Sequence, residues 1–193
     1  MKARSAFAAV LLGFGALIAS TQASAQGFYV GGAFGSTDAG EGNAIPDLIT
    51  SGAVDGKGSG FKFYGGYAFT PNVAVEMAFV DLGRLKYSGS FVGAPVTNGR
   101  VDTSGLNSSV VGTLPLGSGF SLFAKAGLFA WTAEARDITN GFPFSGTDSG
   151  AGLSVGVGGE FHVTRNLGLR AEWESFDAND TISMVSLGLA YHF

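Results

Sequence analysis

After residue 25, apolar residues recur at every second position in eight segments of the chain. Alternation with a period of two is typical of β-strands whose two faces meet different environments. In the last segment, for example, Leu187 and Leu189 share one face while Ser186 and Gly188 share the other. The predicted strands lie at residues 28–34, 61–69, 73–79, 106–114, 120–131, 153–163, 167–173 and 185–193.

The gaps between these segments alternate between long and short. Long polar, Gly-rich gaps span residues 36–58, 83–104 and 134–149, and a shorter last loop spans 176–181. Tight turns at 70–72, 115–119 and 164–166 separate the other segments. Short turns at one end and longer loops at the other are typical of outer-membrane barrels. We therefore predict an all-β fold, an eight-stranded antiparallel up-and-down transmembrane β-barrel. Both ends of the mature chain would then lie on the periplasmic side.

Alternation alone leaves the direction of the apolar face open, because a soluble calyx with an apolar interior has the same pattern. Here the less apolar face consists mainly of Gly, Ala and Ser, which suit a narrow packed lumen better than a solvated exterior. Aromatic residues lie near strand ends, as in the girdles of membrane barrels; they include Phe28, Phe69, Phe161 and Trp173. These features favour apolar side chains that point outward into lipid.

Residues 1–25 have the features of a secretory signal peptide, which leaves 26–193 as a single barrel domain. Lys2 and Arg4 precede an apolar stretch, and Ala23-Ser24-Ala25 fits a small-residue cleavage site. No later segment is long enough for an apolar membrane helix, so we expect insertion as strands. The chain has no Cys, which excludes thiol chemistry, and a formal net charge of −4. That negative balance argues against nucleic acid as a partner.

The closing segment presents one strongly apolar face. In a soluble protein such a strand would be an edge prone to aggregation, whereas a closed barrel in a bilayer gives it both a partner strand and an apolar solvent. The residues of this face are Val185, Leu187, Leu189, Tyr191 and Phe193.

Several short motifs, in order along the mature chain, resemble the OmpA-type transmembrane barrel family. They include Tyr64-Gly65-Gly66-Tyr67, Val75-Glu76-Met77 and Leu169-Arg170-Ala171-Glu172-Trp173. The resemblance implies an outer-membrane barrel of a Gram-negative bacterium, and insertion by the barrel-assembly machinery, which reads the terminal aromatic strand. A periplasmic peptidoglycan-binding domain often follows the barrel in that family. The sequence closes at Phe193, so the resemblance does not imply wall anchoring.

Four charged residues fall on the inward-facing positions near mid-strand: Glu76, Lys125, Glu160 and Arg170. Isolated charges in a low-dielectric interior are costly, so we expect these groups to be paired. The resemblance also implies an ion-pair cluster at these positions. One lumen lysine of the family corresponds to Val111 here, which puts the family's gating by exchange of ion pairs in doubt.

No catalytic, cofactor-binding or metal-binding residue is predicted, and we do not expect an enzyme. His162 and His192 are the two histidines, and both are placed at the periplasmic end, without a Ser or Asp at catalytic spacing. Asp177, Asn179 and Asp180 lack the spacing of a calcium loop and are explained by turn chemistry.

The predicted role is therefore structural, with surface interactions through the extracellular loops. Outer-membrane lipids are expected partners, and the long loops are candidate contacts for host or other surface ligands. The alternative is a narrow channel for small solutes, gated by the lumen ion pairs. A soluble lipid carrier is a third reading.

Overall fold

The computed structural model describes residues 27–39, 49–55, 57–91, 94–139, 142–178 and 180–193. The predicted signal peptide, residues 1–25, lies outside this part of the chain. The described residues form nine strands: β1 (Gly27–Asp38), β2 (Ile49–Asp55), β3 (Lys57–Thr70), β4 (Val73–Phe91), β5 (Ala94–Gly117), β6 (Phe120–Thr139), β7 (Phe142–His162), β8 (Leu167–Ala178) and β9 (Asp180–His192).

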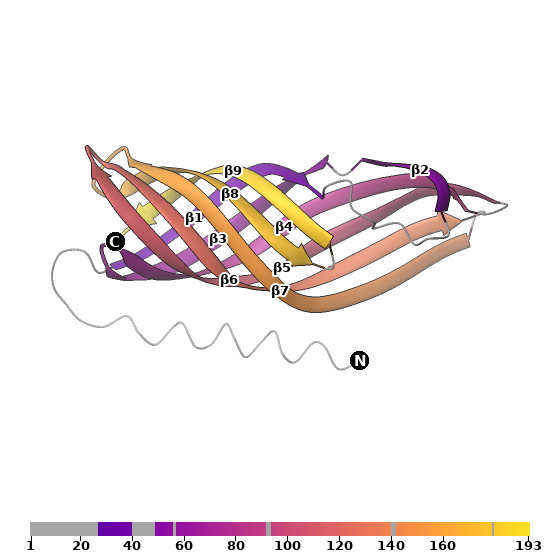
Figure 1. Ribbon diagram of the computed structural model, residues 1–193, viewed down its shortest axis with the longest axis horizontal. Helices are drawn as coiled ribbons and strands as arrows, with labels where there is room; N and C mark the ends of the chain where they lie inside the picture. Colours follow the sequence, from indigo (N-terminus) through magenta and orange to yellow (C-terminus); the bar gives the residue numbers. More distant parts are fainter. Residues whose placement is uncertain (1–26, 40–48, 56, 92–93, 140–141, 179) are drawn as a thin grey trace.

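Eight of these strands form one closed antiparallel ring. The order around the ring is β1-β3-β4-β5-β6-β7-β8-β9, and β9 pairs with β1 from Tyr29↔His192 to Asp38↔Ser183. The ninth strand, β2, lies outside the ring and pairs with the distal part of β4. The predicted all-β, eight-stranded barrel is confirmed, and its strands wind obliquely around a common axis (Figure 1).

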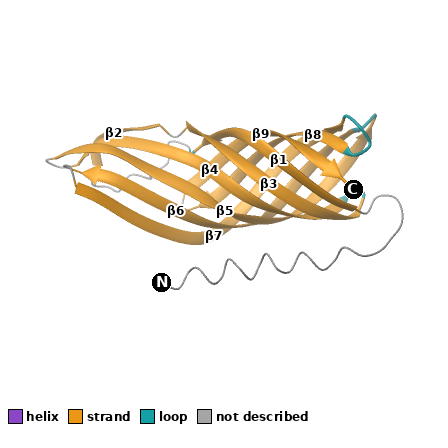
Figure 2. Ribbon diagram, turned by 180° about the vertical axis from the view of Figure 1, so that it is seen from behind, coloured by secondary structure: helices purple, strands orange, loops and turns teal. Residues whose placement is uncertain are grey.

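The short turns and both ends of the described chain lie at the same end of the barrel. The turns join β3 to β4, β5 to β6 and β7 to β8. Phe193 donates its backbone N–H to the carbonyl of Phe28 at 3.0 Å, which joins the last residue to the first strand. This end carries the C-terminal label in Figure 2. In an outer-membrane barrel it is the periplasmic end.

At the opposite end the strands differ in length. The expectation that residues 83–104 and 134–149 form long loops is wrong. The segments 83–104 and 134–149 are mostly strand, because β4 runs to Phe91, β5 starts at Ala94, β6 runs to Thr139 and β7 starts at Phe142. These four strands have 19 to 24 residues, whereas about 9–11 suffice to cross the hydrocarbon core. Together with β2 they form a wall of strands beyond the barrel rim (Figures 1 and 2). We call this part the distal wall.

The two faces of the ring differ as predicted for a membrane barrel. Apolar side chains point outward and are exposed, as for Leu153 (66%), Leu187 (64%) and Phe63 (64%). Residues on the other face are buried and include several charged ones, such as Glu76 and Arg170. The calyx reading is wrong, since the apolar row of β9 faces away from the lumen. Among the described residues, no helix has the length and apolarity needed to cross a membrane.

Candidate functional site

Six charged side chains meet inside the barrel, three acidic and three basic. They come from four strands and are all buried: Lys62 on β3, Glu76 on β4, Lys125 on β6, and Arg170, Glu172 and Glu174 on β8. We call this set the lumen charge cluster. Lys62 contacts both Glu172 and Glu174, and Lys125 contacts Glu174. Lys125 Nζ also lies 2.5 Å from Glu172 Oε1 and 3.3 Å from Glu76 Oε1. Each carboxylate thus contacts at least two cations, which offsets its loss of hydration.

Arg170 is held by acids and by aromatic rings. Its Nη1 lies 2.9 Å from Glu76 Oε2, and its Nε lies 3.3 Å from Glu172 Oε2. The guanidinium carbon lies 4.0 Å from the ring centroid of Phe123 and 4.7 Å from that of Tyr64. Cations are attracted to the faces of aromatic rings, most strongly where water is excluded. Arg170 is therefore fixed both in position and in orientation.

Strand alternation explains how β8 supplies half of the cluster. Arg170, Glu172 and Glu174 are two residues apart, so all three face the lumen while Leu169, Ala171 and Trp173 face outward. On the neighbouring strand β7, Gly156 lies at the level of both Lys125 and Glu174. A Cβ atom there would lie 3.0 Å from Lys125 Cε and 3.0 Å from Glu174 Cγ. Glycine at this position leaves room for the two long side chains to meet.

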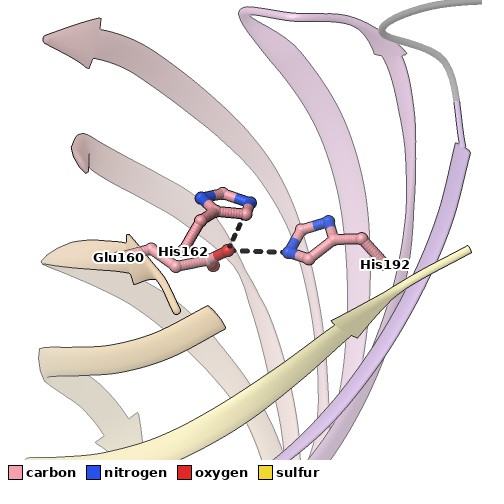
Figure 3. Close-up of side chains that lie close together, drawn as sticks. All are labelled: Glu160, His162 and His192. Atoms are coloured by element: carbon pink, nitrogen blue, oxygen red, sulfur yellow. Dashed lines mark hydrogen bonds and ion pairs between the residues drawn. The ribbon is translucent and has the colours of Figure 1, made fainter. Parts of the chain in front are cut away.

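Glu160 lies in a second group at the periplasmic mouth. Its Oε1 lies 2.7 Å from His192 Nε2 and 3.4 Å from His162 Nε2, and the two imidazole centroids are 5.0 Å apart (Figure 3). The proximity of the two histidines agrees with their predicted place at the periplasmic end. Of the four predicted lumen charges, the structure brings Glu76, Lys125 and Arg170 together and places Glu160 with His162 and His192.

Three members of the lumen charge cluster were not predicted from the sequence. Glu172 and Glu174 share the inward face with Arg170, so alternation along β8 could have identified them. Lys62 lies between the outward Phe61 and Phe63 and could have been found in the same way. Val111, which stands where the resemblance implies a lumen lysine, is buried and uncharged. Lys62 contributes a buried cation from a different strand.

The lumen contains several layers along its length. At the periplasmic end is a cavity of about 370 Å³ whose lining includes Tyr29, Glu160, His162, Arg170 and His192. The lumen charge cluster follows. Beyond it, Phe129 and Phe176 are fully buried with ring centroids 4.8 Å apart. The charged and aromatic layers therefore separate the periplasmic cavity from the distal end of the barrel.

The distal wall has one level at which basic residues are adjacent. Lys86 pairs with Arg100, and Arg100 pairs with Arg136, so β4, β5 and β6 each contribute one basic residue. Asp55 of β2 pairs with Lys86 and is the acidic residue at this level. We call Lys86, Arg100 and Arg136 the basic row.

Together, the closed ring, the apolar exterior and the sequestered charges define an integral β-barrel membrane protein. The chain matches the family described as "Outer membrane protein beta-barrel domain" over residues 6–193, and it belongs to that family. It is therefore an OmpA-like barrel of a Gram-negative outer membrane.

Among characterised relatives, outer membrane protein A of Yersinia pseudotuberculosis is 26% identical over 203 residues, and that of Shigella flexneri is also 26% identical over 203 residues. All of this chain is covered in both cases, but only 55% and 56% of the relatives. The chain thus spans about half the length of these proteins.

Solved structures share the fold. OprG from Pseudomonas aeruginosa aligns with a TM-score of 0.67 at 13% identity, covering 90% of this chain and 100% of OprG. Ail, the attachment invasion locus protein of Yersinia pestis, aligns with a TM-score of 0.59 at 20% identity, covering 89% of this chain and 100% of Ail. The Ail structure is a complex with the heparin analogue sucrose octasulfate. At these identities the likeness concerns the fold.

Proposed function

We propose that this protein is a surface-interaction barrel whose distal wall binds ligands outside the cell. The observation that carries the proposal is the extension of β4–β7 well beyond the length needed to cross the membrane. Ordering so many additional residues costs conformational entropy and contributes nothing to spanning the bilayer. Long segments of this kind at the outer end of a barrel are usually functional.

The chemistry of the wall favours an anionic ligand. The basic row sets one basic residue from each of β4, β5 and β6 in the same cross-strand register. Lysine and arginine form charge-assisted hydrogen bonds with anionic oxygens, so a polyanion is the ligand class complementary to this row. Ail, which shares the fold, has been crystallised with a sulfated heparin analogue. We therefore propose sulfated polysaccharides as the ligand class.

The contents of the lumen support this role over that of an open pore. A conducting path would have to pass the lumen charge cluster and the layer of Phe129 and Phe176, all of which are buried. Eight-stranded barrels have interiors that side chains can fill. We propose that the cluster acts as a plug that fixes strand register, with no reaction catalysed there.

Shortened hairpins test the proposal. One variant replaces residues 86–100 with Asn-Gly, which reconnects the paired residues Leu85 and Val101. A second variant replaces 136–145 with Asn-Gly and reconnects Ala135 and Gly146 in the same way. Binding of the purified protein in nanodiscs to immobilised heparin is then measured by surface plasmon resonance. We expect saturable binding by the natural protein and loss of binding by both variants.

Point substitutions separate the basic row from general charge. The triple variant K86Q/R100Q/R136Q removes the row, whereas K57Q/R84Q/R165Q removes the same number of positive charges elsewhere. We expect the first to abolish heparin binding and the second to retain most of it. Equal losses would point to nonspecific electrostatics, and binding by the shortened variants would contradict a role for the wall.

We also propose two steps in the biogenesis of the barrel. The secretory signal would be removed after Ala25, and the outward row of β9 (Val185, Leu187, Leu189, Tyr191 and Phe193) would be recognised by the barrel-assembly machinery. This row is exposed at all five positions, which supports its availability to a lipid or protein partner during insertion.

A further inference from the structure

We propose that Glu160, His162 and His192 form a binding site for a divalent first-row transition metal ion, with Zn²⁺ as the best match, at the periplasmic mouth of the barrel. The three side chains each offer one ligand atom, and these atoms all lie within 4.8 Å of one another. Two imidazoles and one carboxylate form a common set of protein ligands in zinc sites that keep one position open.

The separations are close to those that a metal ion requires. Two ligands at about 2.1 Å from one ion are about 3.4 Å apart in tetrahedral geometry and never more than about 4.2 Å apart. The separations of Glu160 Oε1 from His162 Nε2, 3.4 Å, and from His192 Nε2, 2.7 Å, fall within that limit. No separation in the group exceeds 4.8 Å, so the largest has to close by at most about 1.4 Å to reach the tetrahedral value. Both imidazoles approach the same Glu160 oxygen (Figure 3), so rotation of these side chains is the movement that the site requires.

The fold brings the three ligands together across one intervening strand. Glu160 and His162 are two residues apart on β7 and share its inward face, whereas His192 comes from β9. Between these strands, β8 contributes Gly168 at the level of His162. A Cβ atom on Gly168 would lie 2.6 Å from Glu160 Oε1. The absence of a side chain there lets the carboxylate lie over β8 and reach His192.

Neighbouring groups hold the site and leave it accessible. The Tyr29 ring stacks on the His192 imidazole, with centroids 5.5 Å apart and an interplanar angle of 29°. The Glu160 side chain is 8% exposed, while those of His162 and His192 are 34% and 32% exposed. All three line the periplasmic cavity, so water or a small ligand can reach the remaining coordination positions.

The charge of the site suits a cation. Two neutral imidazoles and one carboxylate give the ligand set a single negative charge. Arg170 also lines the cavity, but its guanidinium is committed to Glu76 and Glu172. In the metal-bound form both Nε2 atoms donate lone pairs, so the imidazoles carry their protons on Nδ1.

The composition of the chain makes the test unusually clear. His162 and His192 are the only histidines and there is no Cys, so a tag-free preparation has no other imidazole or thiol ligands. Co²⁺ is titrated into the tag-free mature barrel in detergent, and its visible absorption is recorded. Zn²⁺ binding is measured by calorimetry, and NMR of the two imidazole rings is followed as Zn²⁺ is added. Migration on unheated gels verifies that each variant is folded.

We expect one equivalent of Co²⁺ or Zn²⁺ to bind, with shifts of both imidazole rings. H162Q and H192Q should each lose saturable binding, and E160Q, which keeps the side-chain shape, should weaken it by about tenfold or more. G168V should weaken binding by displacing Glu160, whereas D177N at the other end of the barrel should bind normally. Unperturbed imidazole resonances in the natural protein, or binding that survives H162Q/H192Q, would overturn the proposal.

Discussion

Arg170 on β8 and Glu76 on β4 meet across the full width of the barrel, with 2.9 Å between Nη1 and Oε2. Three strands lie between β8 and β4 on either way around the ring, so the pair joins opposite walls. Tyr29 connects a third part of the barrel, β1, to the same carboxylate, because its hydroxyl donates a hydrogen bond of 3.0 Å to Glu76 Oε2. Glu76 is thus the point at which distant parts of the chain are connected.

Removal of one partner of this pair should be strongly destabilising. Arg170→Ala leaves Glu76 and Glu172 with fewer cations in a buried site, and breaking a buried pair typically costs about 3–5 kcal/mol. The free energy of unfolding in urea, measured in lipid vesicles, provides the test. Arg84→Ala serves as the control, because the Arg84–Asp102 pair is exposed and should contribute less than about 1 kcal/mol. Equal losses for the two variants would contradict a stabilising role for the lumen pair.

Arg170→Ala should leave the electrical conductance of the barrel unchanged. The contacts of Lys62 and Lys125 with Glu172 and Glu174 remain in this variant, and Phe129 and Phe176 still fill the next layer. Single-channel recordings in planar bilayers check this expectation. An increase in current for folded Arg170→Ala protein would favour the channel alternative, in which the ion pairs gate a pore.

A positive charge on the outward face should be costly near the centre of the membrane. Leu187 is 64% exposed and lies midway along β9, so Leu187→Arg should destabilise the folded barrel by about 2–4 kcal/mol in vesicles. Tyr191→Arg lies near the periplasmic end and should cost about 0–1 kcal/mol. A water-facing exterior would tolerate both changes equally, which is the outcome that would refute the assignment of faces.

Phe193→Ala should slow assembly by the barrel-assembly machinery without lowering stability. The Phe193 side chain is 74% exposed and its backbone N–H bonds to Phe28, a contact that alanine retains. Folding is followed by gel migration in proteoliposomes with and without the purified machinery. Val163→Ala removes apolar surface at the same end of the barrel and should have no effect specific to the machinery. Equal behaviour of the two variants would count against recognition of Phe193.

Most of the barrel could be predicted from alternation, because each strand meets lipid on one face and a small lumen on the other. The structure confirms this pattern on β7, for example, where Val155 and Val157 face outward and Ser154 and Gly156 face inward. The lengths of the strands were harder to predict, since the sequence of the distal parts of β4–β7 lacks the alternating pattern. Their pairing depends on backbone hydrogen bonds, for which polar residues give no strong signal.

The partners of the lumen charges could not be predicted, for a geometric reason. Alternation assigns a residue to a face but does not state which strand lies opposite, and that depends on the stagger of the whole ring. The position of Glu160 beside His192 required the register of three strands and the missing side chain of Gly168. Residues 32 positions apart therefore became neighbours without a local signal in the sequence.

The outer mouth of the barrel is asymmetric, because its rim is higher on one side than on the other. β8, β9 and β1 end after 12 or 13 residues, while β4–β7 continue outward on the other half of the circumference. A molecule that approaches the mouth from outside therefore meets β4–β7 on one side of the axis before it meets β8, β9 and β1 on the other.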